Sequence, residues 1–140
     1  MKNLPKLFFA AAALFALCGM IWGIQMSATH DHTLSPAHGH LNLIGFVMMA
    51  VFGTYYALTP EAGRSRTAGI HFLLNTATVL ILTPGIALAI SGQTEVLAQI
   101  GSVLAVLSMV MFAFVVFKYG VGHVADEGVT GNRLTTQPAE

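Results

Sequence analysis

Four of the six histidines in this 140-residue chain lie close together in the sequence. His30 and His32 flank Asp31, and His38 and His40 repeat the same spacing a few residues further on. Neutral imidazole binds zinc, copper and haem iron, and a carboxylate adds an oxygen ligand. We therefore interpret the four histidines as candidate metal ligands for copper or zinc. The alternatives are a solvated polar loop for His30 and His32, and for His38 a side chain that faces lipid headgroups or water.

His40 has a second feature that sets it apart. It lies about one turn into an apolar block, residues 36–58, on the order of 6 Å from the N-terminal end of that block. The orientation predicted below makes this the outer end. A histidine at this depth in a membrane is costly without a partner, so we expect a functional role. Asn42 adds a polar group nearby, but on a helix it points away from the face of His40. The two side chains are therefore expected to have different partners.

The third apolar block, residues 67–90, carries another polar cluster. His71 and Asn75 are one helical turn apart, and Thr78 continues the same stripe. His71 has three interpretations: an interhelical hydrogen bond, a second haem near the inner face, or a proton or quinone site. Because His40 and His71 lie near opposite faces, their offset along the membrane normal is on the order of 20 Å. One iron cannot bind both within a chain.

Composition decides what kind of fold can hold these side chains. The chain is 55% hydrophobic and 9% charged, whereas a soluble domain carries about 25% charged residues. Six scattered cations cannot form the basic patch of a nucleic-acid-binding protein. The single cysteine, Cys18, excludes an internal disulfide. These numbers argue against a soluble domain and against a partner made of nucleic acid.

The apolar residues fall into four blocks that are each long enough to cross a bilayer. Because unpaired backbone amides are prohibitive in lipid, we predict an all-α integral membrane four-helix bundle over residues 1–120. Gly19 and Gly23 form a small-xxx-small motif suited to close helix packing. The four expected spans are residues 5–27, 36–58, 67–90 and 96–119.

The cations predict how the bundle lies in the membrane. With four spans, all six Lys and Arg residues fall on one side, which the positive-inside rule makes the cytoplasm. They are Lys2, Lys6, Arg64, Arg66, Lys118 and Arg133. Both termini are then cytoplasmic. From its polar composition we expect residues 121–140 to form a flexible tail. We expect the membrane to be a bacterial inner membrane. The alternative is that the first block is a signal peptide cleaved near Ala28, which leaves three spans.

The second block resembles a helix of a known family. The run His40-Leu-Asn-Leu-Ile-Gly-Phe, continuing through Phe52-Gly-Thr-Tyr-Tyr-Ala-Leu-Thr-Pro-Glu61, is similar to the second helix of the haem–copper oxidase subunit I superfamily. It is nearest the nitric oxide reductase and cytochrome-c-oxidase-like branch. In that branch the helix opens with H-x-N, and its histidine is an axial ligand of the low-spin haem. The resemblance gives this role to His40.

The chain also departs from the family pattern. The family's catalytic subunit uses further histidines on later helices, whereas this sequence has neither a His-Pro-Glu motif nor a paired His-His. The resemblance therefore implies a relative that binds haem b without the catalytic centre and acts in electron transfer or in haem or gas binding. We do not expect a single chain to act as an enzyme.

A haem at His40 needs a second axial ligand. The candidates are His38 or a loop histidine of the same chain, His40 of another copy, or an exogenous molecule. We favour a two-fold dimer, because the axis relates identical residues at identical depth. The expected partners are membrane lipid, a second copy and a redox partner. The cofactor-binding candidates are His40, Asn42 and His71.

Two other functions stay open. One is an outward-facing copper or zinc protein that uses the four clustered histidines. The other is an accessory membrane subunit whose histidines are hydrogen-bonded packing residues.

Overall fold

The computed structural model describes residues 3–122, and these residues contain helices but no strand. Three consecutive elements, α2, η1 and α3, form one continuous helix whose middle part is wound as a π-helix. Most of the predicted tail, from residue 123 on, lies outside the described residues, as does the predicted orientation signal at Lys2 and Arg133. In chain order the helices are α1 (Leu4–Thr29), α2 (Ser35–His40), η1 (Leu41–Met48), α3 (Met49–Leu58), α4 (Pro60–Arg64), α5 (Arg66–Ile90) and α6 (Val96–Tyr119).

Four helices are long and apolar enough to cross a membrane: α1, the continuous α2–η1–α3, α5 and α6. Their bounds lie within two residues of the predicted spans, so the all-α assignment and the four helices are confirmed. The ends are well defined by local chemistry. Pro5 and Pro36 lie in the first turns of α1 and α2, where no backbone donor is needed. Ser65 caps α5 by accepting a hydrogen bond from the backbone N–H of Ala68.

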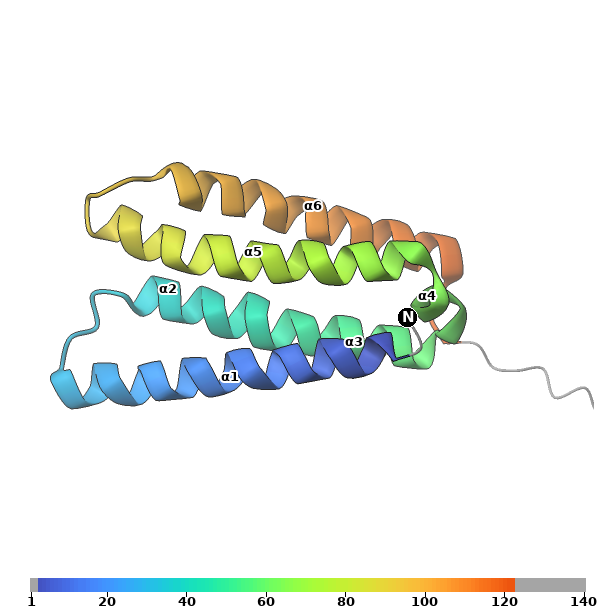
Figure 1. The fold of residues 1–140 in the computed structure, drawn as a ribbon, viewed down its shortest axis with the longest axis horizontal. Coiled ribbons are helices and arrows are strands. Elements are labelled where there is room, and N and C mark those ends of the chain that lie inside the picture. The colour runs from blue at the N-terminus through green and yellow to red at the C-terminus, as the bar shows by residue number, and fades with distance from the viewer. Residues whose placement is uncertain (1–2, 123–140) are drawn as a thin grey trace, which may run out of the picture.

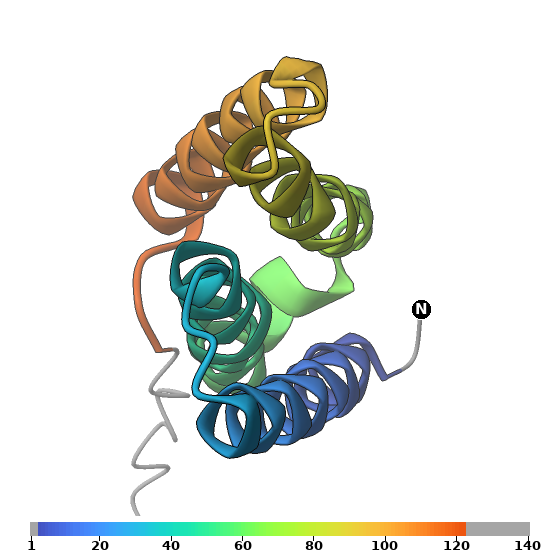
Figure 2. The same cartoon turned by 90° about the vertical axis from the view of Figure 1, so that its left-hand side faces the viewer.

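The long helices form two antiparallel hairpins (Figure 1). α1 packs against η1 and α3, and α5 packs along α6. The hairpins meet where α2 and η1 contact α5, which leaves α1 and α6 on the flanks (Figure 2). The short α4 joins them at the end that also holds the chain N-terminus, which we call the basic end because Arg64, Arg66 and Lys118 lie there. The opposite end, with loops 30–34 and 91–95, is the histidine end.

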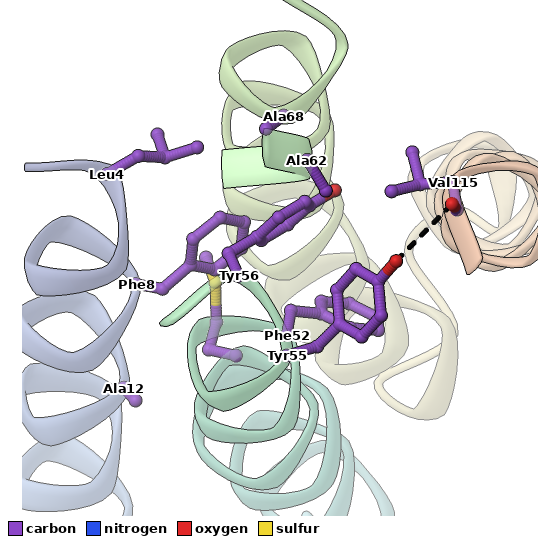
Figure 3. Packing of buried hydrophobic residues seen from close by; sticks show 10 residues of the cluster. Leu4, Phe8, Ala12, Phe52, Tyr55, Tyr56, Ala62, Ala68 and Val115 are labelled. Carbon is purple, nitrogen blue, oxygen red and sulfur yellow. Dashed lines mark hydrogen bonds between the residues drawn. The ribbon is translucent and has the colours of Figure 1, made fainter. Parts of the chain in front are cut away.

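The buried aromatic core lies toward the basic end (Figure 3). Phe8 of α1 stacks on Tyr56 of α3 with 5.4 Å between ring centroids, and it meets Phe52 edge-on at 6.3 Å. The hydroxyl of Tyr55 lies 3.3 Å from the carbonyl oxygen of Val115 on α6. The Phe8 contacts hold α1 against α3, and the Tyr55 contact ties the two hairpins together at this end of the molecule.

Two glycines bring α5 and α6 into close contact. A Cβ added to Gly101 would lie 2.6 Å from the Cα of Leu82. A Cβ added to Gly85 would lie 2.5 Å from the backbone nitrogen of Ala98. Both distances are far below van der Waals contact, and the atoms that would be hit belong to backbone. No larger residue fits at either position unless the helices separate.

The flanks of the structure are apolar and exposed in a single chain. On α1, Leu14 and Ile21 are 64% and 67% exposed, and on α6, Val103 and Val106 are 60% and 64% exposed. Apolar surface of this extent is unfavourable in water. A bilayer or another apolar surface is needed to cover it.

Candidate functional site

His40 lies at the junction of α2 and η1, toward the histidine end. Its Nδ1 is 2.7 Å from the carbonyl oxygen of Pro36, one turn earlier, so Nδ1 carries the proton and donates. Nε2 is then the unprotonated nitrogen, and no described residue forms a hydrogen bond with it. Imidazole oriented in this way by a backbone carbonyl has the form in which histidine usually binds a metal.

The surroundings of His40 differ from those expected for a partnered side chain inside the bundle. The helix turns its buried side, with Ala37, toward α5, so the His40 side chain is exposed on the surface of the single chain. A Cβ on the preceding Gly39 would meet nothing within 4 Å. Leu43 and Val47, further along the same face, are 56% and 42% exposed. His40 therefore stands at one end of an exposed apolar stripe, which we call the His40 face (His40, Leu43 and Val47).

The backbone changes from α to π winding directly after His40. Such segments are rare and occur frequently at functional sites. Gly45 lets α1 and α5 approach this segment, since a Cβ there would lie 2.9 Å from Phe15 and 3.1 Å from Val79. The π-helix therefore packs closely against both α1 and α5. These contacts fix the orientation of the helix that carries the His40 face.

His38 and Asn42 face α1 and not the outer surface. Asn42 Nδ2 donates to the backbone carbonyl of His38 at 2.9 Å and lies 3.2 Å from its Nε2. The His38 ring meets Trp22 edge-on with 5.9 Å between centroids. A Cβ on Gly19 would collide with the Asn42 side chain, and one on Gly23 would lie 3.2 Å from His38 Cε1. The close packing predicted for the two glycines is confirmed, and its partners are polar.

The loop at the histidine end leaves His30 and His32 exposed. The Asp31 carboxylate between them accepts a hydrogen bond from the backbone N–H of Thr33 at 2.9 Å. Hydrogen bonds from Thr33 lower the pKa of the Asp31 carboxyl from its ordinary value. Within residues 3–122, no three His, Cys, Asp or Glu side chains gather closely enough to hold an ion. The copper or zinc interpretation of the four histidines stays a prediction.

A chain of hydrogen bonds crosses the interior of the fold through His71. The Tyr56 hydroxyl donates to His71 Nδ1 at 2.9 Å, and His71 Nε2 donates to Ser108 Oγ at 3.2 Å. Ser108 donates to Asn75 Oδ1 at 2.9 Å, and Asn75 Nδ2 donates to the Ile44 carbonyl at 3.4 Å. The single hydroxyl hydrogen of Ser108 goes to Asn75, so His71 must be the donor at Nε2. Among the described residues, no buried side-chain polar atom lacks a partner.

These hydrogen bonds link η1, α3, α5 and α6. They confirm the interpretation of His71 as a residue with interhelical hydrogen bonds. Both ring nitrogens are engaged, so an iron at His71 would have to displace Tyr56 or Ser108. Thr78 takes no part, because its hydroxyl bonds to the Leu74 carbonyl of its own helix. The sequence did not identify Tyr56 and Ser108 as the partners of His71. A signal was present, since a serine in the middle of the fourth apolar block needs a partner.

Replacing His71 with leucine should lower the free energy of unfolding by about 2–3 kcal/mol. Interhelical hydrogen bonds in membranes contribute about 0.6 kcal/mol on average and up to about 1.7. The substitution breaks two of them and disturbs the packing against Phe52, whose ring centroid is 4.4 Å away. Equilibrium unfolding in detergent micelles, followed by circular dichroism, measures the difference. Thr78→Val is the matched control, and an equally large effect there would contradict the role of the network.

In the part of the chain that the structure describes, the predicted site residues fall into four groups. His38 and Asn42 pack against α1, His71 belongs to the buried network, His30 and His32 lie in the exposed loop, and His40 is an exposed side chain with an unprotonated Nε2. Comparisons of the chain with protein families, with curated proteins and with solved structures found no match. The assignment of a function therefore rests on the residues and their geometry.

Proposed function

We propose that this chain is an integral membrane protein that binds haem b, with His40 as an axial ligand of the iron. The observation that carries the proposal is the hydrogen bond from His40 Nδ1 to the Pro36 carbonyl, at 2.7 Å, which leaves Nε2 unprotonated on an exposed side chain. The four long apolar helices and their exposed flanks support the membrane location. The side taken by the cations favours cytoplasmic termini and a bacterial inner membrane.

The donor set and the surface around it fit a porphyrin. Neutral imidazole on a helix is a good ligand of haem iron. The open space at Gly39 allows a flat macrocycle to approach the backbone, and Leu43, Phe46 and Val47 offer exposed apolar contacts beside it. When bound, the haem would supply one-electron transfer.

The second axial ligand in this proposal is His40 of a second copy. His38 of the same chain faces α1, where it contacts Trp22 and Asn42, so it does not share the outward face. A two-fold axis that pairs two His40 faces brings identical histidines together at identical depth. It also covers apolar side chains that are exposed in the single chain. The haem site and the dimer interface are then the same surface.

The residues of the chain have distinct tasks in this arrangement. His40 binds the iron, and the Pro36 carbonyl holds its proton on Nδ1 and orients the ring. Asn42 is a positioning residue, because it bonds to the His38 carbonyl in the turn that carries His40. Leu43 and Val47 exclude water from the bond between His40 and the iron.

A spectrum of the purified protein tests the proposal. The protein is prepared in detergent after expression with haem supply, and a reduced-minus-oxidised spectrum is recorded together with metal analysis of the same sample. We expect sharp α and Soret bands and about one iron per two chains. Stoichiometric copper or zinc without haem would support the alternative metal protein. A sample with no haem and no metal would support an accessory subunit and overturn the proposal.

A further inference from the structure

A groove lies at the basic end, on the side where the first turn of α1 faces α4 and the start of α5. Its volume is about 380 Å³. Leu4 forms part of its wall and is almost fully buried. The groove is far from the His40 face, which lies toward the other end of the second span. It is lined by Leu4, Gly63, Arg64, Arg66, Ile70 and Leu73.

Two cations line this groove. Arg64 is the last residue of α4, and Arg66 is the first residue of α5, so the turn between the helices brings both arginines to the same groove. Both side chains are exposed. A second groove of about 250 Å³, lined by Asn3, Pro5 and Pro60 among others, adjoins the first along Leu4, Gly63 and Arg64. Planar guanidinium groups pair well with phosphate oxygens, and two of them favour a ligand with negative charge.

The wall of the groove changes from cationic to apolar along one face of α5. Arg66, Ile70 and Leu73 follow each other at helical spacing, so they share that face. Ile70 and Leu73 are 56% and 66% exposed, and they lie further from the end of the helix than Arg66 does. A ligand that fits this gradient has an anionic head at the end of the bundle and a hydrocarbon part that runs along the helix. A free anion would leave the apolar part of the groove unused.

We propose that this groove binds the headgroup of an anionic phospholipid, with the phosphodiester between Arg64 and Arg66 and the upper part of an acyl chain along Ile70 and Leu73. The site is independent of the proposed haem site, since it shares no residue with it. It lies on the side that the cations predict to be cytoplasmic, where anionic lipids attract basic residues. Phosphatidylglycerol is the probe of this chemistry, and phosphatidylcholine, which carries no net charge, is the contrast.

Native mass spectrometry of the protein in detergent, titrated with each lipid, tests the proposal. Each arginine near an anionic surface favours binding by about 5-fold, so R64Q/R66Q should weaken phosphatidylglycerol binding by about 25-fold. Phosphatidylcholine binding should change little. K118Q is the matched control, because Lys118 is a cation of the same end whose Nζ lies over the rings of Tyr119 and Phe114, 5.1 and 5.9 Å from their centroids.

Two further measurements make the outcome decisive. Inorganic phosphate at equal concentration should not displace phosphatidylglycerol, because it lacks the hydrocarbon part, and displacement would show a plain anion site instead. L73Q keeps both arginines and should still weaken lipid binding. The proposal is overturned if the wild-type protein binds both lipids equally or if K118Q weakens binding as much as R64Q/R66Q. Should R64Q/R66Q fail to fold, R64K/R66K keeps the charge while removing the planar donors, and it should still weaken phosphatidylglycerol binding more than K118Q does.

Discussion

Replacing His40 with alanine is expected to remove the haem spectrum of the purified protein. In the proposed dimer each chain supplies one axial ligand from its His40 face, so the substitution deletes both ligands of the iron at once. His38, the other histidine of this helix, faces α1, so it cannot take over. The expected result is loss of the Soret and α bands at unchanged protein yield, measured by reduced-minus-oxidised spectroscopy and haem extraction.

The matched control for this experiment is His38→Ala, two positions earlier on the same helix. His38 packs against Trp22 and Asn42, so its loss should reduce stability and leave the spectrum in place. Imidazole added to the His40→Ala protein should restore part of the spectrum, since the free ligand can enter the space that the side chain leaves. A His40→Ala protein that binds haem with an unaltered spectrum would exclude His40 as the ligand. A spectrum lost only in His38→Ala would assign the ligand to His38.

Replacing Gly101 with leucine is expected to cause the largest loss of stability among the substitutions considered for the fold. Even a Cβ at this position would lie 2.6 Å from the Leu82 Cα and 2.9 Å from its backbone nitrogen, so the clash cannot be relieved by a side-chain rotation. α5 and α6 would have to separate. Overpacking of this kind costs about 3 kcal/mol or more. Equilibrium unfolding in detergent and the yield of folded protein measure the effect.

Gly39→Ala is the control for the Gly101 experiment, because a Cβ at Gly39 meets nothing within 4 Å. Alanine favours helix over glycine by about 1 kcal/mol, so this variant should be as stable as the parent or more stable. A less stable Gly101→Leu protein and a Gly39→Ala protein of equal or higher stability would establish the cause. Backbone contact, and not helix propensity, then controls whether a glycine can be replaced. A Gly101→Leu protein as stable as the parent would contradict the close packing of α5 on α6.

The helical spans were predictable because a membrane imposes one strong constraint on the backbone. Each apolar block must satisfy its own amide groups, so a helix is required wherever the block is long enough. The structure agrees with these bounds, since Pro5 and Pro36 lie in the first turns of their helices and Ser65 caps α5. Gly19 and Gly23 were recognised as a contact motif from their spacing alone, and the structure confirms the contact.

The environment of each polar side chain was less predictable. Spacing correctly separated the direction of His40 from that of Asn42, but it did not reveal that His40 faces outward while Asn42 faces α1. The stripe of His71 and Asn75 suggested a polar contact, but its partners Tyr56 and Ser108 come from other helices. No local pattern connects residues that are tens of positions apart in the sequence.

By itself the sequence determined the four apolar helices, their ends, and the short set of polar residues that needs an explanation. The tertiary structure decided which of those side chains are hydrogen-bonded inside the protein and which are exposed on its surface. The physical reason is that these helices are apolar on nearly every side, so hydrophobicity does not choose how a helix is rotated about its axis. Rotation is chosen by close contacts at small residues, such as Gly19 against Asn42 and Gly101 against Leu82. Those contacts bury His71 and leave His40 facing outward.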